Sequence, residues 1–179
     1  MLSSLGAAFV PQVSKLVARY IAEQRFRYLP RARHLSSAQT SAVVDFFSAE
    51  LLGAVRVLTL EGEQVPDPNF YPMLRAVGFA NLPSQASAAA ITFADVVVAH
   101  EPFSNDLLFH ELVHAEQYRQ LGIERFAELY VRGFLAGGGY DGIPLEVNAY
   151  TLGVHYAAEP CRAFSVANAV HEWLVTGKF

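Results

Sequence analysis

The sequence is poor in cysteine, and this shortage excludes one class of protein. Only one of the 179 residues is a cysteine, Cys161, so no disulfide can form within the chain. A small secreted scaffold held together by disulfides is excluded, a reducing compartment is the simpler assumption, and Cys161 is expected to be a small buried hydrophobe. With 53% hydrophobic residues the chain can bury one core without such bonds. We therefore expect a single domain over residues 1–179, with a helical N-terminal part (1–53) followed by strands and metal-binding helices (54–179).

Basic charge is also scarce. The chain has 13 Lys and Arg against 17 Asp and Glu, a net charge of -4, so we expect no nucleic-acid partner, which would need a clustered basic surface. Six of the 13 basic residues lie within residues 15–33, where Glu23 is the only acid. This segment is interpreted as a solvated helix face followed by a polar loop. Docking of segment 15–33 on an anionic lipid surface or an acidic partner is the alternative.

Long apolar runs and a leader pattern are lacking as well. The longest uncharged run, residues 76–94, contains Asn81, Pro83, Ser84 and Gln85, whose polar groups would be unsatisfied in hydrocarbon. The first residues contain no basic side chain, and their apolar stretch is cut short by Pro11. We predict no transmembrane segment and no signal peptide, and hence a cytoplasmic protein.

Helical periodicity dominates the chain. Apolar spacing, capping residues and the positions of Gly and Pro predict helices over about 12–27, 37 or 41 to 52, 104–121, 123–136, 144–156 and 162–175. Branched residues predict strands over 55–60 and 91–99, and the segment between them reads as irregular with a short helix near 73–77. The predicted fold class is α+β, helix-rich with a small sheet.

The motif His110-Glu-Leu-Val-His114 lies in one of these predicted helices. Two imidazoles four residues apart lie on one helix face and can bind the same ion, for which zinc is the preferred candidate. Glu111 projects about 100° away from His110, where it can deprotonate a water rather than bind the metal. The alternative is a pair of packed histidines with Glu111 in solvent.

A catalytic zinc site usually has three protein ligands. Gln117 and Gln120 exclude the extended metzincin signature, so the third ligand is sought downstream. We select Glu146, because the glycine-rich turn 137–142 and Pro144 begin a new helix that can return toward the histidines. Its alternative is a helix-start glutamate stabilised by the helix dipole.

Other side chains could take part in this site. The weaker candidates for the third ligand are Glu116, Glu128 and His155, and spacing alone does not exclude His100, Glu101 or His171. Tyr140 and Tyr150 could donate a hydrogen bond to a developing oxyanion, although core packing explains both as well. Asp106 and Gln117 could orient a ligand imidazole, or serve as a helix cap and a solvated side chain.

The stretch 109–118, together with 144–150, resembles the zincin superfamily of metallopeptidases, in particular the gluzincin branch, and is similar to small bacterial zincin-like proteins of unassigned function. The resemblance implies that His110, His114 and Glu146 are the zinc ligands and Glu111 the catalytic acid/base. It also implies that strand 91–99 is an edge strand that pairs with extended substrate. Tyr150 departs from the pattern, because many gluzincins have an Asp four residues after the ligating Glu.

These patterns lead to one functional hypothesis and two alternatives. The hypothesis is a zincin-like domain that hydrolyses a peptide bond with Zn²⁺ and the general base Glu111, with a peptide or protein as its partner. The alternatives are a non-catalytic metal-binding regulatory or interaction module, and a metal-dependent hydrolase of a non-peptide bond. The high apolar content is also compatible with a dimer or a peripheral membrane protein.

Overall fold

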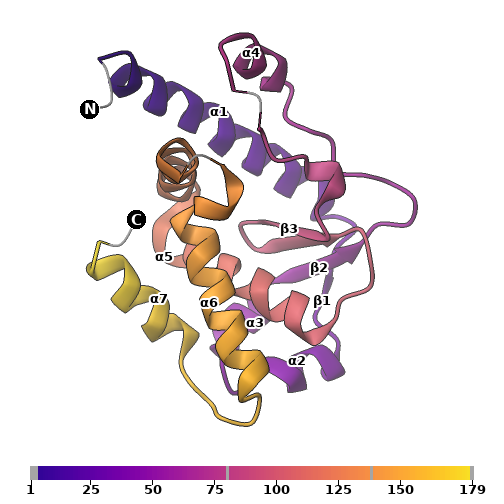
Figure 1. Cartoon of the computed structure of the whole chain (residues 1–179). Helices are drawn as coiled ribbons and strands as arrows, with labels where there is room; N and C mark the ends of the chain where they lie inside the picture. The colour runs from indigo at the N-terminus through magenta and orange to yellow at the C-terminus, as the bar shows by residue number, and fades with distance from the viewer. Residues whose placement is uncertain (1–3, 80, 138, 178–179) are drawn as a thin grey trace.

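The computed structural model describes residues 4–79, 81–137 and 139–177 (Figure 1). Its helices are α1 (Ser4–Tyr28), α2 (Ser37–Val43), α3 (Ala49–Ala54), α4 (Tyr71–Ala76), α5 (Asn105–Gly137), α6 (Pro144–Ala158) and α7 (Val166–Val175), with short 3-10 turns at Gln85–Ser87 and Tyr140–Gly142. They surround one four-stranded mixed sheet. The predicted α+β class is therefore confirmed.

The sheet contains β1 (Arg33–His34), β2 (Arg56–Thr59), β3 (Ala90–Phe93) and β4 (Val96–Ala99), in the order β1-β2-β4-β3. The single strand predicted over 91–99 is wrong, because β3 and β4 form an antiparallel hairpin in which Phe93 pairs with Val96. The turn between them uses Ala94 at a positive φ of 60°. The uninterrupted run of strand-forming residues hides this turn, since it lacks the Gly, Asn or Pro that usually indicates one.

The N-terminal helices also differ from the prediction. Helix α1 begins at Ser4 and includes Pro11, and the helix predicted to reach residue 52 is two helices. Ser36 caps α2 in a capping box with Gln39, and Ser48 caps α3 by accepting a hydrogen bond from the Leu51 N–H. Two buried phenylalanines between the helices pack into the core. The second cap thus starts a new helix where periodicity alone had predicted a continuous one.

Helix α5 is the central element and packs against α1 and α6 (Figure 1). The two helices predicted on either side of Gly122 are confirmed, because Gly122 has non-helical backbone angles (φ 72°, ψ 167°) and kinks α5 at that point. The Ser104 hydroxyl accepts a hydrogen bond from the Leu107 N–H at the start of the helix. The N-terminal half of α5, which contains the motif, is thus fixed at both ends.

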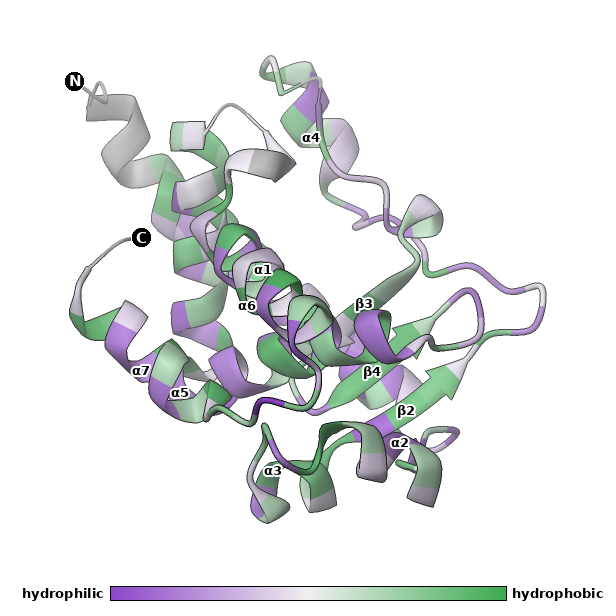
Figure 2. Ribbon diagram, turned by 60° about the horizontal axis from the view of Figure 1, so that its bottom comes forward, coloured by the Kyte–Doolittle hydropathy of each residue, from purple (hydrophilic) through white to green (hydrophobic). Residues whose placement is uncertain are grey.

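The buried side chains of β4 point to both faces of the sheet. Val97 belongs to a core cluster with α2, α3 and the first half of α5, whereas Val96 and Val98 belong to a second cluster with α1 and the second half of α5. In Figure 2 strand β4 is drawn in green, the colour of apolar residues. This double burial makes β4 an interior strand and leaves β3 as the edge strand beside α5.

Most of the basic segment 15–33 is engaged in ion pairs. Arg25 binds Asp95 in the β3–β4 turn, and Arg27 and Arg31 both bind Glu63. Arg19 pairs with Glu23 along α1. Two acids from other parts of the fold, Asp95 and Glu63, therefore engage three of the six basic residues of this segment.

Two further expectations concern single features. Cys161 is exposed, so the expectation that it is buried is wrong; it lies in the turn after α6, away from the core clusters. Among residues 4–79, 81–137 and 139–177, no helix has the length and apolarity needed to cross a bilayer.

Candidate metal centre

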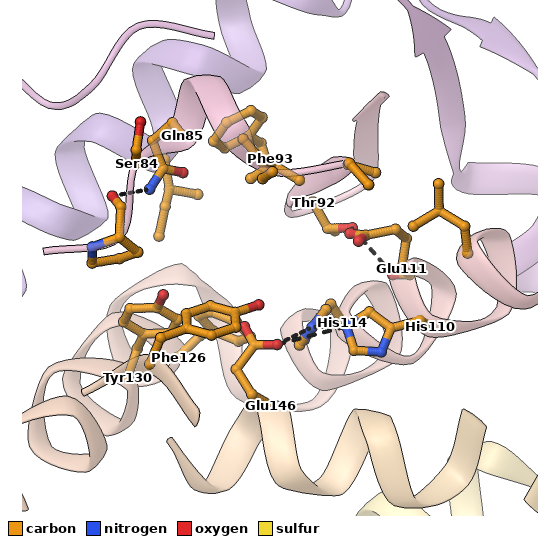
Figure 3. Close-up of a pocket in the computed structure, with 18 of the residues that line it drawn as sticks. Ser84, Gln85, Thr92, Phe93, His110, Glu111, His114, Phe126, Tyr130 and Glu146 are labelled. Atoms are coloured by element: carbon orange, nitrogen blue, oxygen red, sulfur yellow. Dashed lines mark hydrogen bonds and ion pairs between the residues drawn. The ribbon is translucent and has the colours of Figure 1, made fainter. Parts of the chain in front are cut away.

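His110 and His114 lie on the face of α5 that is turned toward α6, and Glu146 in the first turn of α6 points between them (Figure 3). The two Nε2 atoms are 3.1 Å apart. Glu146 Oε2 lies 3.6 Å from Nε2 of His110 and 3.3 Å from Nε2 of His114. The structure thus brings together all three residues that the sequence singled out as ligands, as one group that could hold a metal ion.

The spacing of these atoms fits zinc. With bonds of about 2.0–2.1 Å to nitrogen and oxygen, neighbouring ligand atoms of a tetrahedral zinc site are about 3.3–3.4 Å apart. The three observed separations, 3.1, 3.3 and 3.6 Å, lie around that value. Glu146 Oε2 is buried, and no described residue donates a hydrogen bond to it. A buried carboxylate oxygen without a donor is costly unless a cation neutralises it.

The charges of the centre are strongly coupled. Burial lowers the pKa of His114, but the Glu146 carboxylate outweighs this effect and raises the pKa to about 9. Burial likewise raises the pKa of Glu146, whereas His114, His110 and Tyr140 together hold it well below its usual range. Glu146 is therefore an anion, and it stabilises positive charge beside it.

Close approach of α5 and α6 explains how Glu146 reaches the histidines. A Cβ atom on Gly133 would collide with the ring of Pro144, so the glycine allows the start of α6 to pack against α5. Gly137 and Gly142 meet backbone to backbone, and a Cβ on either would lie within 2.8 Å of the other's main chain. These contacts join the two ends of the predicted glycine-rich turn.

The ligands are held by a second layer of hydrogen bonds. Nδ1 of His114 is 2.9 Å from Oε1 of Gln117, and Nε2 of Gln117 donates to Leu145 O and to Asn148 Oδ1, each at 3.0 Å. Gln117 is fully buried. Because its Oε1 can only accept, it favours a proton on Nδ1 of His114; once the ring is neutral, this is the tautomer whose Nε2 lone pair could bind a metal. The prediction that Gln117 orients an imidazole is confirmed as a contact.

The other side chains that were predicted to assist the site lie at three different places in the cleft. Tyr140 lies in the cleft close enough to the Glu146 carboxylate to help lower its pKa, so its hydroxyl is directed at a predicted ligand rather than at a substrate oxyanion. Tyr150 is 55% exposed, and its ring centroid lies 4.6 Å from that of His110. Asp106 is exposed at the end of the cleft.

Glu111 faces the same space from the opposite side, beside strand β3 (Figure 3). The Thr92 hydroxyl lies 2.6 Å from Glu111 Oε2 and donates to it. Both side chains are buried, and this contact fixes the carboxylate next to the histidines. Sequence reasoning missed Thr92, and no local signal identifies it, because the contact depends on how the hairpin packs on α5.

These residues line a cleft of about 790 Å³. Its floor is α5, one wall is β3, and the other wall is α6. At one end it is closed by α1 and by residues of the segment between β2 and β3, among them Ser84 and Gln85 (Figure 3). The centre therefore lies inside a cavity large enough for a ligand.

The weaker candidates for the third ligand lie elsewhere. Glu116 is buried but bound by Arg119 and Gln120, and Glu128 pairs with Arg125 and Arg132. The remaining four (His100, Glu101, His155 and His171) are not part of the group that could hold a metal. His155 stacks on Phe164, and His100 bonds to the Val65 N–H and the Ala88 carbonyl.

Comparison of the chain with protein-family models, with curated proteins and with solved structures gives no match. The function must therefore be argued from the chemistry of the site.

Proposed function

We propose that this protein is a zinc-dependent metallopeptidase of the zincin type. The observation that supports this most is the convergence of His110, His114 and Glu146, with ligand atoms 3.1–3.6 Å apart, beside a fourth side chain suited to general base catalysis. His110, His114 and Glu146 would hold the ion. Zinc supplies Lewis-acid chemistry in such a site, because it lowers the pKa of water toward about 7 and polarises a carbonyl group.

Glu111 would move the proton. Its carboxylate can accept a proton from the attacking water and return it to the leaving amine. The Thr92 hydroxyl donates a hydrogen bond to Oε2. The other carboxylate oxygen, Oε1, is not bound by Thr92. Burial of Glu111 and Thr92 keeps bulk water away from this transfer.

An extended peptide is the substrate form that the edge strand favours. The His100 N–H donates to the Ala89 carbonyl, so residues 89, 91 and 93 use their backbone groups for pairing with β4. By the alternation of an antiparallel ladder, the N–H and C=O groups of Ala90 and Thr92 point away from β4, and both residues line the cleft. A peptide could add to this edge with its scissile bond beside the centre.

The test compares metal content and peptide cleavage in one set of variants. The zinc-loaded parent should cleave members of a fluorogenic peptide library, and Glu111→Gln should retain zinc by mass spectrometry but cleave about 10²–10⁴-fold more slowly. Glu146→Ala should lose zinc and activity together. A Glu111→Gln variant as active as the parent, or a zinc-loaded parent that cleaves nothing, would contradict the proposal.

Two other functions remain as outcomes of this test. A non-catalytic metal-binding module would bind zinc without cleavage of any substrate, and a hydrolase of another bond would act on esters or lipid amides but not on peptides. Membrane contact through residues 15–33 has less support, because Arg25, Arg27 and Arg31 are paired with Asp95 and Glu63.

A further inference from the structure

We infer that the substrate of this centre is a peptide segment of low charge, with a bulky apolar side chain on one side of the scissile bond and non-acidic apolar residues on the other. This inference rests on the proposed function, and it adds the substrate class. It comes from the two ends of the cleft, which lie on opposite sides of the ligands along α5.

The first region, called here the aromatic end, lies beyond His114. Its rings come from α1, β3, α5 and the segments around them: Tyr20, Phe70, Tyr71, Phe93, Tyr118, Phe126, Tyr130 and Tyr140. Phe126 stacks on Tyr118 at 3.7 Å and on Tyr130 at 6.2 Å between centroids.

Two hydroxyls of the aromatic end are already used by the protein. Tyr20 donates to the Pro66 carbonyl, and the Tyr71 hydroxyl accepts from Gln85. Burial also raises the pKa of Tyr71 to about 12, so its hydroxyl stays neutral. Phe70, Phe93 and Phe126 carry no polar group, so what the aromatic end mainly offers to a ligand is ring surface, which suits an aromatic or large aliphatic side chain.

The charge of the cleft excludes acidic substrates. Among the described residues that line it, none is Lys or Arg, and three are acids: Asp106, Glu111 and Glu146. A substrate carboxylate in the aromatic end would lose its hydration without gaining a cation. The cleft therefore selects against Asp and Glu side chains as well as for apolar ones.

The second region, called here the α6 end, lies on the other side of His110. It is lined by Leu107, Tyr150, Gly153, Val154 and Ala157, with Asp106 beside them. Val154 is 70% exposed. Apolar side chains at the mouth of a cleft are suited to contact an apolar stretch of ligand.

The length of the cleft suits a short peptide. Asp106 and Tyr118 both line it and are 12 residues apart on a helix, which corresponds to about 18 Å at 1.5 Å per residue. An extended chain covers that distance in about five or six residues at 3.3 Å each. The outward backbone groups of Ala90 and Thr92 favour a peptide over a lipid chain, which could not bond to them.

Binding without turnover gives the direct test. Zinc-loaded Glu111→Gln protein would be titrated calorimetrically with acetyl-Ala-Ala-Phe-Leu-Ala-Ala-amide and with the same peptide carrying Glu-Glu in place of Phe-Leu. We expect the apolar peptide to bind at least about tenfold more tightly. Equal affinities, or no binding of the apolar peptide, would overturn the inference, as would tighter binding of decanoyl amide than of the apolar hexapeptide.

Two pairs of matched variants test the two ends of the cleft, one pair for each end. Val154→Lys places a charge in the α6 end and should weaken apolar binding about tenfold, whereas Val175→Lys changes an equally exposed valine (71%) on α7 outside the cleft and should not. Gln85→Lys adds a cation opposite Phe126 and Tyr130 (Figure 3) and should improve binding of the Glu-Glu peptide. Exposed Gln64, outside the cleft, gives the control Gln64→Lys.

The outcomes separate this inference from the proposed function. Cleavage of peptides by the unaltered protein without preference for apolar residues would overturn the inference and leave the peptidase proposal standing. Apolar preference in Glu111→Gln without any cleavage by the unaltered protein would support the binding specificity and overturn the peptidase proposal.

Discussion

Two buried carboxylates on the α5–α6 side of the molecule, Glu116 and Glu146, have opposite environments. Glu116 is 1% exposed and accepts two hydrogen bonds from Arg119 and one from Gln120, all at 2.6–2.8 Å. Glu146 is 5% exposed, and its Oε2 has two imidazoles near it but no described hydrogen-bond donor. The first carboxylate is paired with side chains of its own helix, whereas the second belongs to a group of three residues that could hold a metal ion. Burial of an acid alone therefore does not distinguish the two residues, whereas the groups around each carboxylate do.

The largest expected difference between Glu146 and Glu116 concerns zinc affinity. Glu146→Gln should reduce affinity by more than about 100-fold, since loss of an outer-shell partner alone costs about 10–100-fold. Glu116→Gln, the matched control, should bind zinc as the parent does. Added zinc should then raise the melting temperature of Glu116→Gln but not of Glu146→Gln. Equal zinc responses of the two variants would show that the environments do not matter.

The next effect concerns the support of His114. Gln117→Leu removes the acceptor for Nδ1 and leaves the ring without its orienting partner. We expect zinc affinity to fall about 10–100-fold, as measured by competition with a chromophoric chelator. Gln120→Leu removes a bond to Glu116 on the same helix and should leave the affinity unchanged. Unchanged affinity in Gln117→Leu would mean that packing alone orients His114.

A third effect tests the segment that closes one end of the cleft. His100 joins the two ends of the segment between residues 65 and 88, because it accepts from the Val65 N–H at 3.0 Å and bonds to the Ala88 carbonyl. His100→Ala should lower the free energy of unfolding by about 1–3 kcal/mol, since two backbone groups lose their partner. The same variant should weaken binding of the apolar hexapeptide, and His171→Ala, an exposed histidine on α7, should do neither. Calorimetry measures both quantities.

The sequence predicts the centre of the site better than its surroundings. His110, Glu111 and His114 follow from the period of one helix, and Glu146 follows from the turn that returns α6 to α5. Thr92 cannot be found in this way, because its contact with Glu111 depends on a hairpin whose turn residue, Ala94, is not a usual turn former. Local periodicity determines what lies on one helix face, whereas contacts between elements depend on the packing of the whole chain.

The smallest effect concerns the ion pair between Arg25 and Asp95. This pair is partly exposed, whereas Glu116 and Glu146 are buried. Burial raises the pKa of Asp95, but the bonds from Arg25 lower it more, so the pKa lies below its usual value of 3.8. Because the folded-state pKa is lowered, the carboxylate stabilises the fold above about pH 4, and this contribution is lost as the pH falls through the folded-state value.

Asp95→Asn should therefore lower the free energy of unfolding by less than about 1 kcal/mol at pH 7, since both side chains are about one-third exposed and water screens the pair. The difference from the parent should shrink as the pH falls below about 4, as measured by urea unfolding at several pH values. Glu23→Gln, which removes the exposed Arg19 pair on the same helix, provides the control and should show a smaller difference at pH 7. A difference for Asp95→Asn that is constant down to the acid transition would mean that Arg25 and Asp95 contribute through packing of the hairpin turn on α1 and not through charge.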